Sequence, residues 1–304
     1  MKGRAWLVAA ACLLAWQLQQ VSGWSIVRRH DVPDSNYINY AAQPQFAAVG
    51  KVLSNVAAGS GTVIANGWWV LTAAHVVAGA NLQSVRFEIG QAVYQAQAVY
   101  IHPNYSGIAN DIALIELSAP VMGVTPAQIY TGSNELGAIG HSVGFGNTGT
   151  GATGQQNNTY GTKRAMQNII DVIGDIVNNQ FVPNPNGTFF LSDFDSPAGN
   201  TNTLGVFGSS PTPLGLEGMG APGDSGGPVF IQVGNGWFIA GVHSFITNSS
   251  AVYGTVLGSI RVSRYASWIN SVVPEPASIA ALAAGLLGLV ARRARKGGKR
   301  AQKA

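Results

Sequence analysis

Short apolar or alternating segments, separated by turn residues, run through the middle of the chain from residue 46 to 269. Alternation with a period of two places one face of a strand in a core, and frequent turn residues connect antiparallel neighbours. The whole chain has 39 glycines, many of them between these segments, which fits many tight turns. The pattern therefore predicts an all-β domain built as barrels or a sandwich. The expected strands are residues 47–53, 61–64, 68–72, 84–89, 92–100, 112–117, 140–144, 227–233 and 237–244.

Two later regions are harder to interpret from pattern alone. Residues 164–178 mix Ile and Val with Asp at no helical period, so they could form a strand or a helix. Residues 184–213 are rich in Asn, Gly, Ser and Pro, which predicts long surface loops. Four oxygen-bearing side chains in that region could bind calcium, although a solvated loop without metal is the favoured interpretation, and no cofactor is expected. They are Asp193, Asp195, Asn200 and Asn202.

The N-terminal residues 1–23 have the features of a secretory signal peptide. Lys2 and Arg4 precede an apolar run that ends at Trp16, and small residues follow at Ser22 and Gly23. The apolar run is short for a membrane anchor. The only cysteine of the chain, Cys12, lies inside this segment, so the exported protein is expected to fold without disulfides. Lipidation of that cysteine is a weaker alternative.

The C-terminal residues 274–304 carry a second targeting pattern. Pro-Glu-Pro at 274–276 is followed by an uncharged, small and apolar stretch at 277–291 and then by a cluster of arginines and lysines. Basic residues remain on the cytoplasmic side, so this segment would cross from an exported domain. The three parts in this order resemble the PEP-CTERM sorting tails of Gram-negative envelope proteins.

That resemblance implies a sorting or processing enzyme as a partner, which would act near the Pro-Glu-Pro. It also implies transient membrane association through 277–291 and a destination in the periplasm, in the outer envelope or outside the cell. A simple C-terminal anchor is the alternative.

The net charge of the middle region differs in sign from that of the whole chain. The whole chain carries +4, but between residues 24 and 273 there are eight basic and twelve acidic residues, a net charge of −4. A basic groove for nucleic acid is therefore not expected.

Three segments of this middle region carry residues suited to acyl transfer. His75 ends an apolar strand, Asp111 opens another apolar strand, and Ser225 lies on a turn between glycines. A serine hydroxyl becomes a good nucleophile when an imidazole removes its proton, and a carboxylate can hold that imidazole in the required tautomer. Flanking glycines leave backbone N–H groups free to bind an oxyanion.

In their order and spacing these segments resemble the trypsin-like serine proteases with the chymotrypsin fold. The likeness extends to residues 60–64, 102–105, 144–146 and 262–269. It implies a domain at 24–273 with two six-stranded antiparallel barrels and a C-terminal helix.

The resemblance also implies a role for each site residue. His75 would be the general base, Asp111 its orienting partner and Ser225 the nucleophile. Gly223 and Ser225 would form the oxyanion hole with their N–H groups, and Ser244 would hydrogen-bond the aspartate. The adjacent His243 lies in an apolar strand and is expected to be a core residue.

The chain departs from the family at its activation segment. Trypsin-like enzymes often become active when a new N-terminus pairs with the aspartate before the nucleophile, here Asp224. Ile26 and Val27 could begin such an N-terminus, but Arg28 and Arg29 stand where glycines are usual. The mode of activation therefore stays open at this point.

A second departure concerns the primary substrate pocket. Its base would be formed by Met219, with Phe245 and Ile246 nearby, which favours an apolar side chain over Arg or Lys because a buried cation would lack a partner.

The sequence predicts a secreted serine endopeptidase that acts on protein or peptide substrates. A catalytically inactive surface-binding domain on the same fold and a structural matrix component are the alternatives. An α/β-hydrolase esterase is disfavoured, because Gly-x-Ser-x-Gly at 223–227 is followed by a strand where that fold requires a helix.

Overall fold

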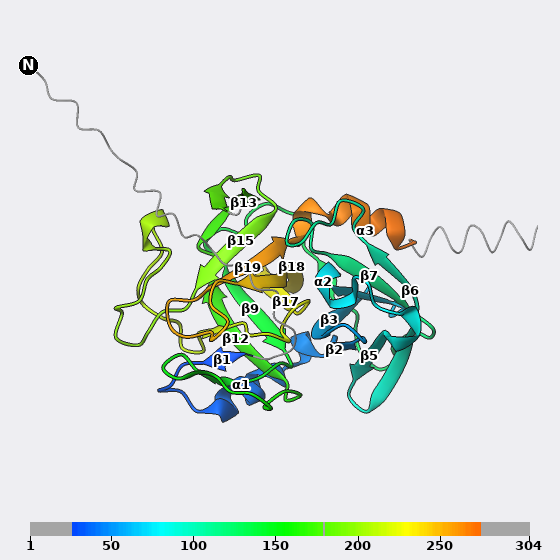
Figure 1. The fold of residues 1–304 in the computed structure, drawn as a ribbon, viewed down its shortest axis with the longest axis horizontal. Helices are drawn as coiled ribbons and strands as arrows, with labels where there is room; N and C mark the ends of the chain where they lie inside the picture. Colours follow the sequence, from blue (N-terminus) through cyan, green and yellow to red (C-terminus); the bar gives the residue numbers. More distant parts are fainter. Residues whose placement is uncertain (1–25, 179, 275–304) are drawn as a thin grey trace, which may run out of the picture.

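Two β units lie side by side in the computed structural model, which describes residues 26–178 and 180–274 (Figure 1). Strands dominate these residues and the helices are short, so the predicted all-β class is confirmed. The predicted signal peptide at 1–23, which contains the only cysteine, lies outside the described residues. So does the predicted tail beyond residue 274, with its apolar stretch at 277–291. Within the described residues, no helix has the length and apolar character needed to span a membrane.

The first unit is a closed six-stranded barrel, formed where the alternating pattern predicted its strands. Inward-facing apolar side chains such as Val52, Val70, Phe87 and Leu114 are fully buried in its core, and each contributes roughly 1.5–3 kcal/mol by leaving water. Its strands are β2 (Val49–Leu53), β3 (Ala58–Ile64), β4 (Trp69–Thr72), β7 (Ala113–Leu117), β6 (Ala92–Ile101) and β5 (Arg86–Ile89), in order around the barrel.

The second unit is a nine-stranded sheet within the described part of the chain. Most of its strands pair antiparallel, and β8 adds to β18 in parallel. Along the sheet the order is β12 (Arg164–Ile169), β9 (Ile139–Gly144), β17 (Pro228–Val233), β18 (Gly236–Ile246), β19 (Val256–Arg261), β15 (Phe189–Asp193), β13 (Val172–Val177) and β14 (Gln180–Pro183), with β8 at Gln128–Ile129.

Pairing of β12 with β15 would close this sheet into the second barrel, and the line along which these two strands meet is called the seam. No strand ladder joins them among the described residues. Instead, Asn168 Nδ2 donates to the Asp193 carbonyl at 2.6 Å, and the Ser192 hydroxyl donates to the Ile169 carbonyl. Side-chain hydrogen bonds therefore take the place of backbone pairing at this seam.

The structure also resolves the two regions that the pattern left uncertain. Residues 164–178 form β12 and β13, so they are strands and not a helix. The prediction of loops throughout 184–213 was wrong for β15, whose five residues are all buried. Its apolar core is only Phe189, Phe190 and Leu191, which the surrounding Asn, Gly and Pro residues obscured.

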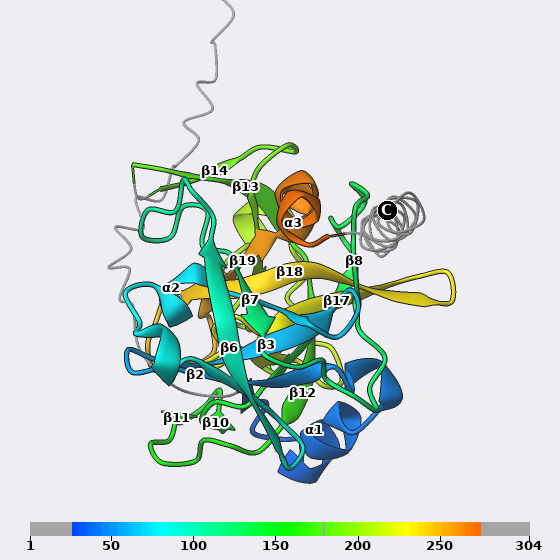
Figure 2. The same ribbon diagram turned by 90° about the vertical axis from the view of Figure 1, so that its right-hand side faces the viewer.

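A short helix that the sequence analysis did not predict, α1 (Asp34–Ala41), packs against β12 below the second unit (Figures 1 and 2). Asp34 lies in its first turn, where the helix dipole favours a negative charge. Both oxygens of that carboxylate accept bonds from the Arg164 guanidinium at 2.7 Å. The Tyr37 hydroxyl, fully buried, donates to the Glu217 carbonyl at 2.7 Å.

The C-terminal helix α3 (Ala266–Val272) follows β19 of the second unit and lies above the first barrel (Figure 1). The His102 ring packs edge-on against Tyr265 and Trp268, with centroid distances of 5.2 and 5.1 Å. The Tyr265 hydroxyl donates to Asn110 Oδ1 at 3.0 Å. The last helix therefore fixes the loop before Asp111 against the second unit.

Candidate active site

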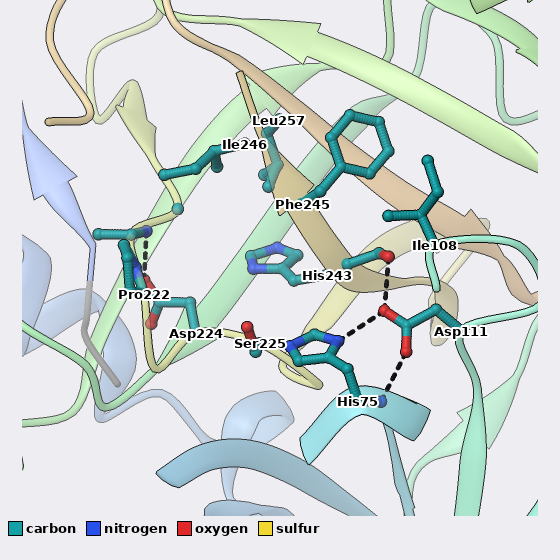
Figure 3. A pocket seen from close by; sticks show the side chains of 13 residues that line it. His75, Ile108, Asp111, Pro222, Asp224, Ser225, His243, Phe245, Ile246 and Leu257 are labelled. Carbon is teal, nitrogen blue, oxygen red and sulfur yellow. Dashed lines mark hydrogen bonds and ion pairs between the residues drawn. The ribbon is translucent and has the colours of Figure 1, made fainter. Parts of the chain in front are cut away.

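Residues from both β units meet in one pocket at their junction (Figure 3). His75 lies on α2 (Ala74–Val77), directly after β4, and Asp111 lies two residues before β7 of the same barrel. Ser225 is on the turn before β17, and Ser244 is on β18 of the second unit. The sequence placed these residues far apart, and the fold brings all four to the lining of the same pocket.

Asp111 binds His75 through both carboxylate oxygens. Oδ2 lies 2.7 Å from His75 Nδ1, and Oδ1 accepts the His75 backbone N–H at 2.8 Å. The Ser244 hydroxyl donates to Oδ2 at 2.6 Å, and the aspartate is only 1% exposed. The ring is thus held with Nδ1 toward the carboxylate, which leaves Nε2 on the other side of the ring.

The contact with Asp111 also determines the direction in which the pKa of His75 shifts. Burial of the ring lowers its pKa, but the negative charge of Asp111 and their hydrogen bond raise it, and the net pKa of His75 lies above its ordinary value.

Ser225 lies beside the His75 ring, on the side away from Asp111 (Figure 3). In the described part of the chain its hydroxyl makes no hydrogen bond, so Oγ can rotate toward Nε2. Such contacts are often loose before substrate binds.

Backbone contacts with the first barrel fix the turn that carries Ser225. Its carbonyl accepts the Ser60 N–H, and the Gly223 carbonyl accepts the Ser60 hydroxyl, both at 2.8 Å. Gly226 has φ +80°, and a Cβ there would lie 2.1 Å from Thr72 Oγ1, so glycine is required. No hydrogen bond engages the N–H groups of Gly223 and Ser225 within the described chain. These are the two groups that the sequence assigned to an oxyanion hole.

Asp224 is buried behind the nucleophile turn, at 1% exposure. Oδ2 accepts the Ala221 N–H at 3.0 Å, and the Gly146 N–H also lowers the pKa of the carboxyl, although Oδ1 makes no hydrogen bond of ordinary geometry among the described residues. Burial raises the pKa of this carboxyl to about 8. The carboxylate occupies the space beside Gly144, where a Cβ would lie 1.8 Å from Oδ1.

The pocket beside Ser225 differs from the expected methionine-based one. Phe245 and Ile246 line it, but Met219 is not among the lining residues. The Met219 side chain is fully buried beside Ile26 and Val27, in a core cluster that lies behind the pocket wall formed by Ala221 and Leu257. The neighbouring Gly220 lines the pocket instead. Leu257 of β19 adds another apolar wall.

His243, expected to be a core residue, also lines this pocket. Strict alternation along β18 would place His243 and Ser244 on opposite faces. The pairing of β18 with β19 shifts register between His243 and Phe245, and consecutive residues from 243 to 246 line the pocket. A β-bulge of this kind is not visible in a sequence pattern.

Of the four residues considered for calcium, the two aspartates are buried, contrary to the prediction of a solvated loop, whereas Asn200 is exposed and Asn202 is half-buried. Asp193 and Asp195 are 2% and 4% exposed. Asp193 Oδ2 accepts the Leu204 N–H at 2.8 Å. No group of three or more His, Cys, Asp or Glu side chains within residues 26–178 and 180–274 is arranged to hold a metal ion.

Two buried carboxyls, Asp195 and Glu217, should make the protein less stable as the pH rises from about 4 to about 8. Burial raises the pKa of Asp195 to about 7 and that of Glu217 to about 8, and neighbouring carboxylates add to both shifts. Between the ordinary and the raised pKa the folded chain retains protons that the unfolded chain releases. The free energy of unfolding then falls by at most about 1.4 kcal/mol per pH unit for each such proton.

Urea unfolding of wild type and Glu217→Gln between pH 5 and pH 8 would measure this effect. The variant should be less stable at pH 5 but show a flatter pH dependence. Equal slopes for the two proteins would contradict the assignment.

The described strands have the architecture of the chymotrypsin-type serine protease family, and the comparisons with known proteins agree. The family model described as Trypsin matches residues 39–183 and 214–269, about two thirds of the chain, so the chain belongs to the trypsin family. A model described as the PEP-CTERM protein-sorting motif matches residues 272–296, which indicates export and sorting to the envelope.

Two curated relatives share a name. Vitamin K-dependent protein C of Oryctolagus cuniculus is 28% identical over 231 residues, which are 71% of this chain and 46% of that protein. The protein of the same name from Mus musculus is 26% identical over 233 residues, with the same shares. The chain thus spans about half the length of the curated relatives it matches.

Proposed function

We propose that the chain is an exported serine endopeptidase that hydrolyses peptide bonds through an acyl-enzyme on Ser225. The single observation that carries this proposal is the arrangement around His75. Asp111 holds Nδ1 at 2.7 Å and is itself held by Ser244. The ring is thereby oriented with its second nitrogen free on the side where Ser225 lies.

In the proposed reaction, Ser225 Oγ attacks the scissile carbonyl while its proton passes to His75 Nε2. The N–H groups of Gly223 and Ser225 bind the oxyanion that forms. The protonated His75, stabilised by the Asp111 charge, then gives its proton to the leaving amine, and the acyl-enzyme remains. Water then attacks the acyl carbon while His75 Nε2 takes its proton. The bond from the acyl carbon to Ser225 Oγ breaks, Oγ receives the proton from His75, and the acid is released.

Labelling with an active-site fluorophosphonate, followed by mass spectrometry of the labelled peptide, tests this proposal against an inactive binding domain. A working protease should be labelled on Ser225 and should hydrolyse a denatured protein substrate. An inactive domain on the same fold would show neither. Prior denaturation of the chain should abolish labelling, because the reactivity depends on the folded contact with His75.

We further propose that the active form begins at Ile26 and that its ammonium group pairs with Asp224. Ile26 is fully buried, and β1 (Val27–Arg28) pairs with β16 (Gly218–Met219) and β10 (Gly149–Thr150). The unpaired Oδ1 of Asp224 supplies a buried acceptor for a cation.

The two arginines that follow do not obstruct this arrangement. Arg28 Nη1 donates to the Val32 carbonyl at 2.8 Å. Arg29 pairs with Asp31 at 2.6 Å and donates to the Leu214 carbonyl at 2.8 Å.

A chain that begins at Ile26 should therefore be at least about 100-fold more active than one that retains Trp24 and Ser25. Removing one partner of a buried ion pair costs about 3–5 kcal/mol. Protonation of the unpaired Asp224 carboxyl, whose pKa burial raises to about 8, relieves part of that cost, and a loss of about 100-fold in the ordered site is expected to remain. Peptide hydrolysis by the two forms, with their N-termini verified by mass spectrometry, measures the difference. Asp224→Asn should reduce the activity of the Ile26 form similarly, and equal activity of the two forms would contradict the pairing.

The location that we propose is the periplasm or outer envelope of a Gram-negative bacterium. The PEP-CTERM motif at 272–296 supports this location. Processing near the Pro-Glu-Pro would release the protease domain from the tail.

A further inference from the structure

The pocket beside Ser225 contains a buried polar group that the proposed reaction does not use. His243 is 2% exposed, and its Nε2 lies 2.9 Å from Ser142 Oγ. Its Nδ1 has no hydrogen-bond partner among the described residues. Leaving a buried polar nitrogen unsatisfied is unfavourable, and buried polar groups are nearly always paired. An unpaired nitrogen in a pocket wall therefore suggests a partner that arrives with the ligand.

Nδ1 faces the space that Gly220 leaves open. A Cβ on Gly220 would lie 3.4 Å from Nδ1 and 3.1 Å from Leu257 Cδ1, so these groups bound the same space. In Figure 3 the His243 ring lies between Ser225 and the apolar side chains of Ile246 and Leu257. A substrate side chain that enters past Ser225 toward Ile246 and Leu257 would thus approach Nδ1, with Asp224 as a second polar group in the lining.

The ring is neutral at any pH at which a His75-dependent enzyme works, because burial lowers the pKa of His243 to about 3. A neutral imidazole has one N–H and one lone pair. The Ser142 hydroxyl can either donate to Nε2 or accept from it, so Nδ1 can serve as acceptor or as donor.

The types of substrate side chain that could precede the scissile bond differ in how well they would pair with His243 Nδ1. An apolar side chain would leave Nδ1 unpaired. A carboxylate would be buried against a neutral ring and near Asp224, which is unfavourable. A cation would find only Asp224, the carboxyl assigned above to the new N-terminus. A carboxamide carries both a donor and an acceptor without charge, so it satisfies either tautomer.

We propose that His243 Nδ1 is the polar recognition group of the primary specificity pocket, which binds the carboxamide of a glutamine or asparagine immediately before the scissile bond. This inference rests on the proposed peptidase function. It replaces the apolar preference predicted from Met219, whose side chain does not reach the pocket.

A matched set of fluorogenic peptides that differ only in this residue tests the inference on the Ile26 form. Glutamine or asparagine should give the highest kcat/KM, about tenfold above methionine or leucine, as one hydrogen bond of about 1.4 kcal/mol predicts. Equal or better cleavage after methionine, leucine, glutamate, arginine or lysine would overturn it. Absence of both cleavage and fluorophosphonate labelling would instead refute the proposed function.

A double variant tests the contribution of His243 Nδ1 by itself. His243→Phe with Ser142→Ala removes Nδ1 without leaving the Ser142 hydroxyl unpaired, and the ratio of kcat/KM for glutamine over methionine should fall to about one. His141→Phe, which replaces another buried histidine outside the pocket lining, is the matched control and should keep the wild-type ratio.

If the double variant does not fold, Gly220→Ala provides the same test. Gly220 does not have a positive φ, so alanine is compatible with its backbone. Its methyl group, 3.4 Å from Nδ1, should lower the glutamine-to-methionine ratio. An unchanged ratio in either folded variant would overturn the role of His243.

Discussion

Replacing Ser225 by alanine should lower kcat for peptide hydrolysis by about 10⁶-fold. The substitution removes the only atom that can form the acyl bond, while the pocket, Asp111 and His75 remain. Binding of substrate should change little, because KM depends on contacts that the variant retains. Steady-state hydrolysis of a fluorogenic peptide by the purified Ile26 form, with urea unfolding to verify stability, measures the loss.

Two further variants make this result specific. His75→Ala should cost about as much as Ser225→Ala, and the double variant should cost little more, since a nucleophile and its base act as one unit. Ser271→Ala, on the exposed side of α3, is the matched serine control and should retain full activity. Activity of Ser225→Ala within tenfold of wild type would refute the acyl-enzyme mechanism.

The parts of this structure that the sequence predicted are those determined by short stretches of chain. The strands of the first barrel follow from alternation within each segment. His75, Asp111 and Ser225 stand out because each occupies an element end beside small or apolar residues. The hydrogen bonds that Asp111 accepts from His75 and Ser244 are of the kind expected of such a set.

The parts that sequence did not predict depend on contacts between distant segments. α1 buries only Tyr37 and Ala41, too little apolar surface for a helical pattern to show. Its position depends on Arg164, about 130 residues away along the chain, and on the Glu217 carbonyl.

The pocket lining depends on contacts of the same kind. Met219 was expected at its base because of its distance from Ser225 in sequence. The fold directs that side chain into the cluster around Ile26, and the shifted register of β18 brings His243 to the lining instead.

Replacing Asp111 by asparagine should lower kcat by about 10⁴-fold at neutral pH. The aspartate accepts three hydrogen bonds, from His75 Nδ1, the His75 backbone and Ser244. An amide has one acceptor oxygen, so its NH₂ group must face a donor or force the ring into the tautomer with the proton on Nε2. In that tautomer His75 cannot accept the Ser225 proton.

The same variant should also move the acidic limb of the pH–rate profile to lower pH. Catalysis requires neutral His75, so wild-type activity is lost as the pH falls through the raised pKa of this ring, above 6.5. The charge of Asp111 and its hydrogen bond are what raise that pKa, so their removal lets burial lower it. Ser244→Ala, which removes one hydrogen bond to the carboxylate but keeps its charge, should cost only about tenfold and leave the limb near its wild-type position. An unshifted limb in Asp111→Asn would mean that the carboxylate does not control the proton on His75, and the residual kcat would then have to be explained by orientation alone.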